Sequence, residues 1–284
     1  MHMNTKPAIV MQTDFTKGVA TCTMDGVIRC IDPTLDTFDS CHDIPVFDTY
    51  AASCALNFVV DFWPAGTIFV SVVDPGVGTD RRACCAKLAN GCYVITPDNG
   101  TLTHVKERIG VEEVRMIDET INRLPTTREV SIFHGRDLFA YCAGRLAAGV
   151  ITFEGVGPAY PVEEIVMHQR ILPTLENGVL RGMIETSERG FGLVDTNIPY
   201  QMLEDMDIHH GSKVCCTVRH NDKTVFSEEV TYAKSFGYVP EGAPLVMISE
   251  TKHVELAKNL RDIATEFDIG SGPSWTMELK KPEA

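Results

Sequence analysis

Residues 67–78 read TIFVSVVDPGVG, a largely apolar run that ends in a turn of Asp, Pro and Gly. An apolar, β-branched run of this kind is typical of a strand buried on both faces, as in a sheet covered by helices. Two further runs end in the same way: residues 8–11 precede the polar residues 13–14, and residues 92–96 precede the turn 97–100. Open α/β sheets bind ligands at the carboxyl ends of their strands. We therefore expect functional residues in these loops.

Helix-like segments alternate with these runs over the first half of the chain. Apolar residues recur at helical spacing in residues 50–63 until Pro64 ends the pattern, and residues 138–148 are rich in Ala and Leu. Alternating strands and helices build a mostly parallel sheet covered by helices. The sequence predicts an N-terminal α/β domain of this type over residues 1–160.

The pattern changes after Gly149, where Gly and Pro become frequent, and residues 161–175 are the predicted linker. Residues 176–284 are expected to form a smaller antiparallel β-barrel domain, because short β-like runs are separated there by Gly, Asn and Asp turns. One late helix is predicted over residues 253–267. The residues after Gly270 are predicted to form a frayed or subunit-bridging tail.

The composition is that of an ordinary globular protein. The 284 residues are 44% hydrophobic and 23% charged, which suffices to bury a large core. A net charge of −14 disfavours binding to nucleic acid or to an anionic membrane surface. The longest apolar runs are interrupted well before the ~20 residues that a membrane span requires. We expect neither kind of partner.

Ten cysteines occur without a Cys-x-x-Cys pair. The chain is long for a disulfide scaffold, and its first residues do not resemble a signal peptide. The doublets at 84–85 and 215–216 lie in strand-like runs, where neighbouring side chains point to opposite faces. A tetrahedral zinc site usually shows paired ligands at short spacing. We therefore expect free thiols, a cytoplasmic location and no metal site.

Taken singly, each polar loop has a structural explanation. Asp14 fits a turn or a helix N-cap, and His134 fits a hydrogen-bonded structural histidine. Asp137 and Arg136 fit a local ion pair. The glycines near Asp74 lack the spacing of a P-loop or a dinucleotide fingerprint, so phosphate binding is weakly supported.

Together, the loops resemble a known family. The S-adenosylmethionine hydroxide adenosyltransferases, which are related to the fluorinase and chlorinase, carry similar motifs in the same order and spacing. The matching positions here are Asp14, residues 72–78 around Asp74, Arg81, residues 97–100 and residues 133–137. The resemblance covers nearly the whole chain. It implies an α/β domain joined to a small β-barrel, and a homotrimer with the substrate between one subunit's first domain and a neighbour's second.

The resemblance implies displacement at the ribose C5′ of S-adenosylmethionine by water or hydroxide, giving adenosine and methionine with no cofactor. The leaving group is a neutral thioether and needs no general acid. Water has a pKa of ~15.7, so the site must orient one water and stabilise its hydroxide character. Asp74, Arg81 and His134 look like the family's water-activating set. Arg81 would stabilise the hydroxide, and Asp74 and His134 would orient the water and accept its proton directly or by relay. Which of the two takes the proton stays open.

Two alternatives remain open. A halogenase would use halide as nucleophile, but the halogenating relatives carry Tyr where this chain has Asp74, and a carboxylate repels halide. Gly135 is shared with the chlorinase and decides nothing. A nucleoside sensor that binds without turnover is the second alternative.

For substrate binding, Asp14 resembles the carboxylate that accepts hydrogen bonds from the two ribose hydroxyls. Aromatic candidates for stacking on ribose or adenine, each equally explained by core packing, are Phe47, Phe133, Phe191 and Phe236. Glu255 and Lys258 fall where the family's late segment meets the adenine edge.

The largest departures from the family concern the methionine end of the substrate. Residues 16–19 run Thr-Lys-Gly-Val where the relatives have a Gly and a second acid. Glu188 takes the place of an Asp that grips the ammonium, and Leu193 replaces an Asn. Glu250-Thr251 replaces a Ser-Arg pair that holds the carboxylate, and a Glu there is repulsive. We therefore expect weak acceptance of S-adenosylmethionine, or a preference for a 5′-substituted adenosine without a free carboxylate.

Overall fold

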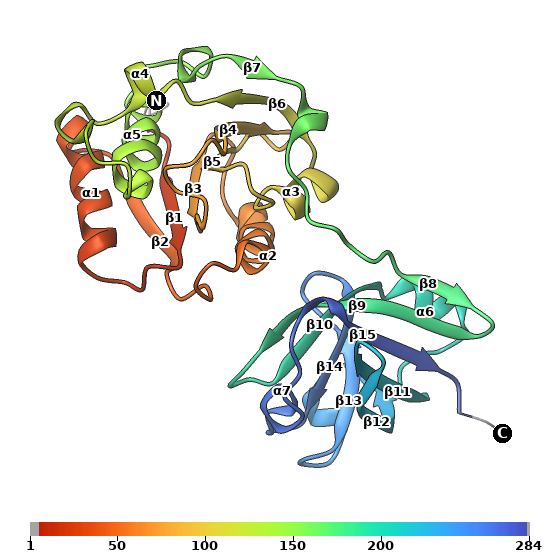
Figure 1. Ribbon diagram of the computed structural model, residues 1–284. Coiled ribbons are helices and arrows are strands. Elements are labelled where there is room, and N and C mark those ends of the chain that lie inside the picture. Colours follow the sequence, from red (N-terminus) through yellow and green to blue (C-terminus); the bar gives the residue numbers. More distant parts are fainter. Residues whose placement is uncertain (1–5, 283–284) are drawn as a thin grey trace, which may run out of the picture. The chain divides into compact units, whose positions relative to one another are not determined.

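The computed structural model describes residues 6–282. Contacts within the chain separate two compact units, Met1–His168 and Gln169–Ala284. The division falls inside the segment 161–175, which the sequence predicts as a linker. Figure 1 shows that the first unit combines a sheet with helices, whereas strands dominate the second.

A seven-stranded mixed sheet forms the centre of the first unit. Its strands are β1 (Ile9–Thr13), β2 (Thr37–Cys41), β3 (Ile68–Val72), β4 (Ala83–Leu88), β5 (Tyr93–Pro97), β6 (Val111–Met116) and β7 (Ala159–Tyr160). They lie in the order β2-β1-β3-β5-β4-β6-β7. The first four of these are parallel, as the sequence predicts, and β4, β6 and β7 are added antiparallel.

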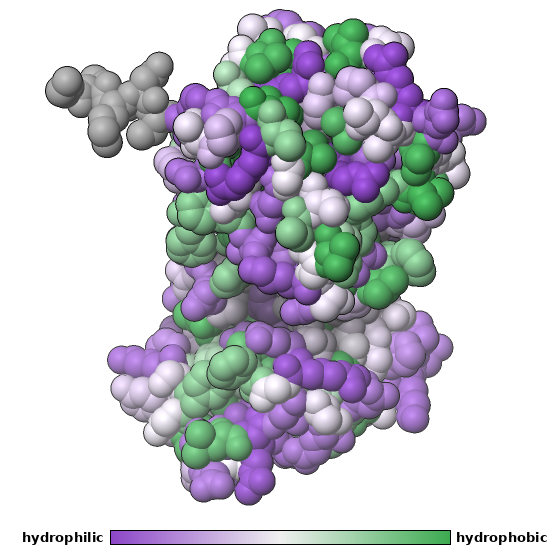
Figure 2. Space-filling model, turned by 90° about the vertical axis from the view of Figure 1, so that its left-hand side faces the viewer, coloured by the Kyte–Doolittle hydropathy of each residue, from purple (hydrophilic) through white to green (hydrophobic). Residues whose placement is uncertain are grey.

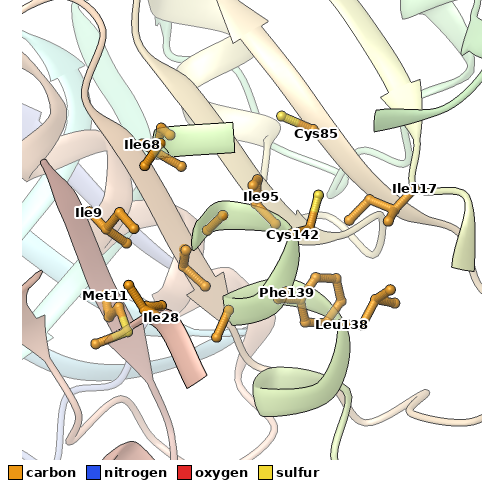
Figure 3. Packing of buried hydrophobic residues seen from close by; sticks show 14 of the residues in the cluster. Ile9, Met11, Ile28, Ile68, Cys85, Ile95, Ile117, Leu138, Phe139 and Cys142 are labelled. Carbon is orange, nitrogen blue, oxygen red and sulfur yellow. The ribbon is translucent and has the colours of Figure 1, made fainter. Parts of the chain in front are cut away.

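Helices cover both faces of this sheet (Figure 1). The helices and helical turns are α1 (Val19–Ile31), α2 (Thr49–Val59), η1 (Val60–Phe62), α3 (Thr103–Arg108), α4 (Glu119–Asn122), η2 (Pro125–Thr127), the π-helical η3 (Gly135–Ala140), α5 (Tyr141–Ala147), η4 (Glu154–Val156) and η5 (Val162–Glu164). One face packs on α1 and η3 through Ile28 and Phe139, as Figure 3 shows. The other packs on α2 and α3 through Leu56 and Val105. The inner parallel strands β1, β3 and β5 are therefore buried on both sides, which explains their largely apolar sequences. The parallel edge strand β2 is instead mostly exposed and polar.

The direction of β4 determines where the loop after β3 ends. Ala83 pairs with Pro97, and Lys87 pairs with Tyr93, in an antiparallel register. The first residue of β4 thus lies beside the last residue of β5. The chain leaves the sheet after Val72 and returns at the same edge, so the loop between β3 and β4 stays beside the segments that follow β1 and β5.

The second unit is a closed barrel. Its elements are β8 (Thr174–Glu176), β9 (Val179–Glu188), β10 (Leu193–Pro199), α6 (Gln201–Asp205), β11 (Lys213–His220), β12 (Lys223–Tyr232), η6 (Phe236–Tyr238), β13 (Pro244–Ile248), β14 (His253–Lys258), α7 (Ile263–Glu266) and β15 (Gly272–Lys280). The strands follow the order β10-β14-β13-β12-β11-β15-β9-β8, and β9 also pairs with β10, which closes a ring of seven. All its pairings are antiparallel except that of β12 with β13. Val214, Cys216 and Val218 alternate into the barrel core, the period expected of a strand with one buried face.

Two expectations for this unit are wrong. The predicted helix over residues 253–267 is instead the strand β14 followed by the short helix α7. Val254 and Leu256 both enter the barrel core, so the apolar period is two, and a positive φ of 56° at Leu260 breaks the chain before α7. The predicted tail after Gly270 is the strand β15, which pairs with both β9 and β11 and completes the barrel.

The doublet cysteines occupy opposite faces of their strands, as expected. Cys84 belongs to the core beneath α2 and α3, and Cys85 to the core beneath η3. All ten cysteines fall within the described residues, and each is a free thiol. Among residues 6–282, none of the helices combines the length and the apolar character needed to cross a bilayer. Figure 2 shows hydrophilic and hydrophobic residues interspersed on the face in view.

Candidate active site

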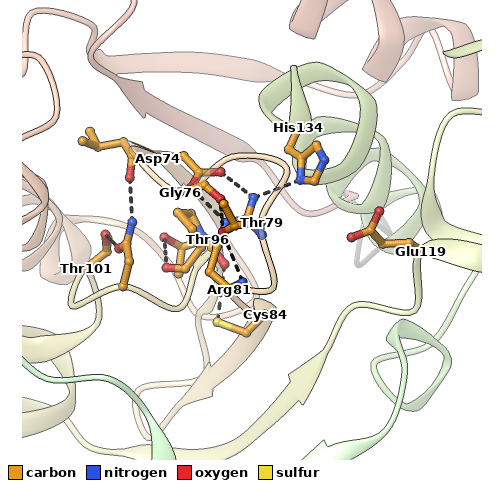
Figure 4. A network of polar contacts seen from close by, with 12 residues as sticks. Asp74, Gly76, Thr79, Arg81, Cys84, Thr96, Thr101, Glu119 and His134 are labelled. Atoms are coloured by element: carbon orange, nitrogen blue, oxygen red, sulfur yellow. Dashed lines mark hydrogen bonds and ion pairs between the residues drawn. The ribbon is translucent and has the colours of Figure 1, made fainter. Parts of the chain in front are cut away.

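Three side chains from separate segments meet at the carboxyl edge of the first sheet (Figure 4). Asp74 follows β3, Arg81 precedes β4, and His134 precedes η3. The Arg81 Nε donates to Asp74 Oδ1 at 2.9 Å, and its Nη2 donates to the second carboxylate oxygen. The same Nη2 lies 2.9 Å from His134 Nδ1. The structure therefore brings the three predicted catalytic residues together.

The loop between β3 and β4 folds Arg81 back onto Asp74. Thr79 anchors the turn, because its Oγ1 donates to the carbonyl of Gly76 at 2.6 Å. Gly78 has a φ of +74°, and a Cβ there would lie 2.9 Å from the carbonyl oxygen of Ser131. A larger residue at position 78 would thus meet both backbone strain and a clash. The glycines of this run serve the turn that closes the ion pair.

His134 is held where a π-helical turn begins. Gly135, the next residue, is tightly packed, because a Cβ there would lie 3.1 Å from the Phe15 ring and 3.2 Å from the Phe133 ring. These two rings pack edge to face with centroids 5.7 Å apart. Single π-helical turns recur at functional sites, and here the turn directs the imidazole toward Arg81.

The three side chains are largely buried. Arg81 and Asp74 expose 11% and 5% of their side chains, and His134 is 4% exposed. Burial lowers the pKa of His134, and the positive charge of Arg81 lowers it further. Because the guanidinium is only a donor, the contact with Arg81 assigns the lone pair of the neutral ring to Nδ1.

Asp14 lies at the same edge of the sheet. It directly follows β1, whose Thr13 pairs with Val72 of β3, so Asp14 and Asp74 leave neighbouring strands. Its Oδ2 accepts a hydrogen bond of 2.9 Å from the backbone N–H of Phe47. Phe47 has a φ of 67° and a largely exposed side chain. Asp14 is thus held by the backbone of a residue whose aromatic side chain is open to solvent.

A chain of hydrogen bonds holds the segment that carries Asp14. The Thr13 Oγ1 accepts from the backbone N–H of Phe15 at 3.1 Å and contacts His42 Nδ1 at 2.9 Å. The other ring nitrogen of His42 lies 2.9 Å from an Asp39 oxygen. Phe133, another predicted stacking residue, packs on Phe15, and the Arg136 guanidinium lies over its ring, 4.9 Å from the ring centre.

The predicted binding residues of the barrel divide into two groups. Glu188 and Glu255 belong to an acidic region that also contains Glu250 and Asp195. Burial, and then the negative charges of Asp195, Glu188 and Glu250, raise the pKa of Glu255 to about 7. Burial likewise raises the pKa of Asp195 to about 6. By contrast, Lys258 bonds both carboxylate oxygens of Glu266, at 2.7 and 2.8 Å.

The barrel also carries two of the predicted aromatic residues and two of the positions at which the chain departs from the family. Phe191 is exposed in the turn between β9 and β10, and Phe236 begins η6 beside a small apolar cluster that includes Leu193. The Thr251 Oγ1 donates to Asp195 at 2.9 Å, so this hydroxyl is occupied within the barrel.

Two charged residues beside His134 have no recognisable signal in the sequence. The Arg123 Nη1 lies 3.5 Å from His134 Nε2 and donates to Glu119 Oε2 at 2.6 Å. Both follow β6, outside every motif. Only the folded structure reveals them, because α4 packs beside α5 and the Arg123 side chain, which follows α4, then lies next to the imidazole.

Comparison with known proteins gives a consistent family. Residues 9–157 match the model of the SAM hydroxide adenosyltransferase N-terminal domain, and residues 190–276 match that of the C-terminal domain. An (R)-S-adenosyl-L-methionine hydrolase from Salinispora tropica is 31% identical over 257 residues, covering 89% of this chain and 90% of the relative. A fluorinase from Actinoplanes is 26% identical, covering 98% and 99%.

A solved structure supports the same assignment. The crystal structure of an uncharacterized conserved protein from Thermotoga maritima matches with a TM-score of 0.85 and 32% identity, and the match covers 96% of this chain and 100% of that one. Both family models, the hydrolase relative and the shared fold agree. The chain belongs to the SAM hydroxide adenosyltransferase family.

Proposed function

We propose that this protein hydrolyses S-adenosyl-L-methionine, or a closely related 5′-adenosyl sulfonium, to adenosine and the free thioether. The observation that carries the proposal is the buried contact of Asp74, Arg81 and His134 in a family whose relatives include named (R)-S-adenosyl-L-methionine hydrolases. The water oxygen forms a bond to C5′ while the C5′–S bond breaks. The electron pair of that bond remains on sulfur, which becomes neutral, and a water proton passes to a base.

The contacts favour Asp74 as the group that receives this proton. The His134 Nδ1 lone pair already faces Arg81 at 2.9 Å, and the other nitrogen of a neutral ring carries a hydrogen. Each Asp74 oxygen accepts one bond from Arg81 and keeps a further lone pair for water. Arg81 would stabilise hydroxide character on the water by its charge, and His134 would fix the guanidinium.

The charge of the site argues against halide as the nucleophile. The buried Asp74 carboxylate would repel an entering anion. Hydrolysis fits the site better.

The leaving group need not be methionine itself. Glu188 and Glu250 carry negative charge at positions that the family uses for the amino acid, and both raise the pKa of the buried Glu255. An acidic surface attracts an ammonium group and repels a carboxylate. We include in the proposal a preference for sulfonium substrates that lack a free carboxylate.

Incubation with S-adenosyl-L-methionine in ¹⁸O-water tests the reaction. Chromatography and mass spectrometry should find adenosine labelled at the 5′ oxygen, and added chloride or fluoride should yield no 5′-halogenated nucleoside. Tight binding without product would instead support the sensor, and a halogenated product would overturn the hydrolase. A parallel panel of adenosyl sulfonium compounds with and without the carboxylate identifies the leaving group.

Assembly and location belong to the same proposal. The family resemblance supports a homotrimer, which light scattering during size-exclusion chromatography would identify. The free thiols, including the exposed Cys22 and Cys30, support a reducing compartment such as the cytoplasm. A neutral leaving group removes the need for an acid or a metal at sulfur, and we expect activity to survive dialysis against a chelator.

A further inference from the structure

Arg123 approaches the side of His134 that faces away from Arg81. It immediately follows α4 and is 9% exposed. Its Nη1 donates to Glu119 Oε2 at 2.6 Å and lies 3.5 Å from His134 Nε2. Its Nη2 donates to the backbone carbonyl of Val130. The guanidinium is thus fixed from two directions, and Figure 4 shows Glu119 on the side of His134 away from Arg81.

The imidazole therefore lies between two guanidinium groups. Arg81 contacts Nδ1 at 2.9 Å, and Arg123 lies 3.5 Å from Nε2. Guanidinium groups donate hydrogen bonds and cannot accept them. A protonated ring would place a third positive charge between them, with both of its N–H groups facing donors. The neutral ring keeps one lone pair for the shorter contact.

We infer that Arg123, held in place by Glu119, is a positioning residue that keeps His134 uncharged and fixes its ring against Arg81. Its catalytic consequence rests on the proposed hydrolytic function, whereas its effect on the imidazole does not. Arg123 touches His134 rather than the nucleophile or the carbon under attack. It would act by preserving the contacts among His134, Arg81 and Asp74.

The charges around His134 have opposing effects on its pKa. Burial lowers the pKa most, and Arg81 and Arg123 lower it further, while Glu119 and Asp74 raise it. Removing Arg123 should therefore move the pKa up toward the ordinary 6.5, and removing the Glu119 charge should move it down. A residue that only supports the backbone would not give shifts of opposite sign in two members of one ion pair.

Titration of the His134 ring by NMR tests this inference in the full-length protein. The Cε1 proton is assigned by its loss in His134→Gln. We expect Arg123→Gln to raise the titration midpoint by about one pH unit and Glu119→Gln to lower it by a similar amount. Arg123→Lys, which keeps the charge, should remain near the original midpoint. Glu119 is an exposed residue, so its variant should fold even if Arg123→Gln does not.

Matched controls come from the same segment. Arg128 and Glu129 are exposed, and Arg128→Gln and Glu129→Gln should leave the midpoint unchanged. Unchanged midpoints in both Arg123→Gln and Glu119→Gln, or shifts of the same sign, would overturn the inference. Because the titration needs no substrate, it can succeed or fail independently of the proposed hydrolysis.

Turnover then measures the catalytic consequence. If His134 must be uncharged, kcat/KM falls on the acid side of its pKa, and this acid limb should move with the NMR midpoint in each variant. Above the limb, Arg123→Gln should lower kcat about tenfold with KM nearly unchanged, and Arg123→Lys should recover most of the loss. If the acid limb of kcat/KM did not move with the NMR midpoint, Arg123 would have no role in the reaction.

Discussion

The two groups of predicted site residues differ in how their charges are balanced. In the first unit, the Asp74 carboxylate bonds Arg81 through both oxygens. In the barrel, Asp195 pairs directly with Glu255 across β10 and β14, and like charges at such positions destabilise a sheet. The first arrangement is organised before any substrate arrives, as catalysis requires. The second retains excess negative charge that a cationic ligand would neutralise.

The balanced group should be the most sensitive to mutation. Asp74→Asn keeps the shape of the side chain but removes its charge, which leaves Arg81 without its ion pair and the water without a base. We expect kcat to fall by about 10³-fold, measured as adenosine release in single-turnover experiments. Asp80→Asn, at an exposed position in the same loop, is the control. Turnover within tenfold of the original by a folded Asn variant would remove Asp74 from the mechanism.

Asp14 tests whether this edge of the sheet also binds the nucleoside. Asp14→Asn can still accept from Phe47 N–H, but it no longer offers two charged acceptors to a ribose diol. Hydrogen bonds to charged groups contribute about 1.5–3 kcal/mol, so adenosine binding should weaken roughly tenfold or more in calorimetry. The exposed Asp36→Asn should bind normally. Equal affinities would place the ribose elsewhere.

Much of the first unit could be predicted because its inner strands are short, largely apolar runs. The apolar runs before Asp14 and Asp74 are buried on both faces, so burial alone identifies them as strands, and a parallel arrangement collects the loops that follow them. The position of Arg81 could not be read in this way. It reaches Asp74 because β4 runs antiparallel to β5, and strand direction depends on contacts between distant residues.

The errors have similar physical causes. Residues 253–267 mix a two-residue period with a short helical turn, and periodicity cannot separate these within one apolar segment. The role of Arg123 cannot be predicted from the residues around it in the sequence, because it depends on α4 lying close to His134 in the folded chain. Sequence motifs therefore identified Asp74, Arg81 and His134, which the structure brings into contact, whereas only the fold revealed the charged residues beside them.

The barrel's excess charge predicts a dependence of stability on pH. The pKa of Glu255 is raised to about 7 from an ordinary value of 4.5, so the folded state binds the proton more tightly than the unfolded state. Stability should fall as pH rises from about 4.5 to 7, and the penalty should be complete above 7. Glu255→Gln should therefore add about 2 kcal/mol at pH 8 and little at pH 4.5.

Urea denaturation at several pH values would measure this difference. The exposed Glu229→Gln is the matched control and should show no such dependence. A constant difference between Glu255→Gln and the original protein across this range would mean that the Glu255 charge is compensated after all. The contrast between the two units would then lose its strongest support.

The smallest expected effect concerns the exposed acids Glu188 and Glu250. If they repel the substrate carboxylate, Glu250→Gln should lower KM for S-adenosyl-L-methionine about threefold, because exposed charges are strongly screened. High salt should abolish the gain, and a dimethylsulfonium analogue of adenosine, which has no carboxylate, should show none. The exposed Glu176→Gln controls for net charge. An equal gain with both substrates would mean that Glu250 acts on the sulfonium or the protein as a whole, and the barrel would then have no role in choosing the leaving group.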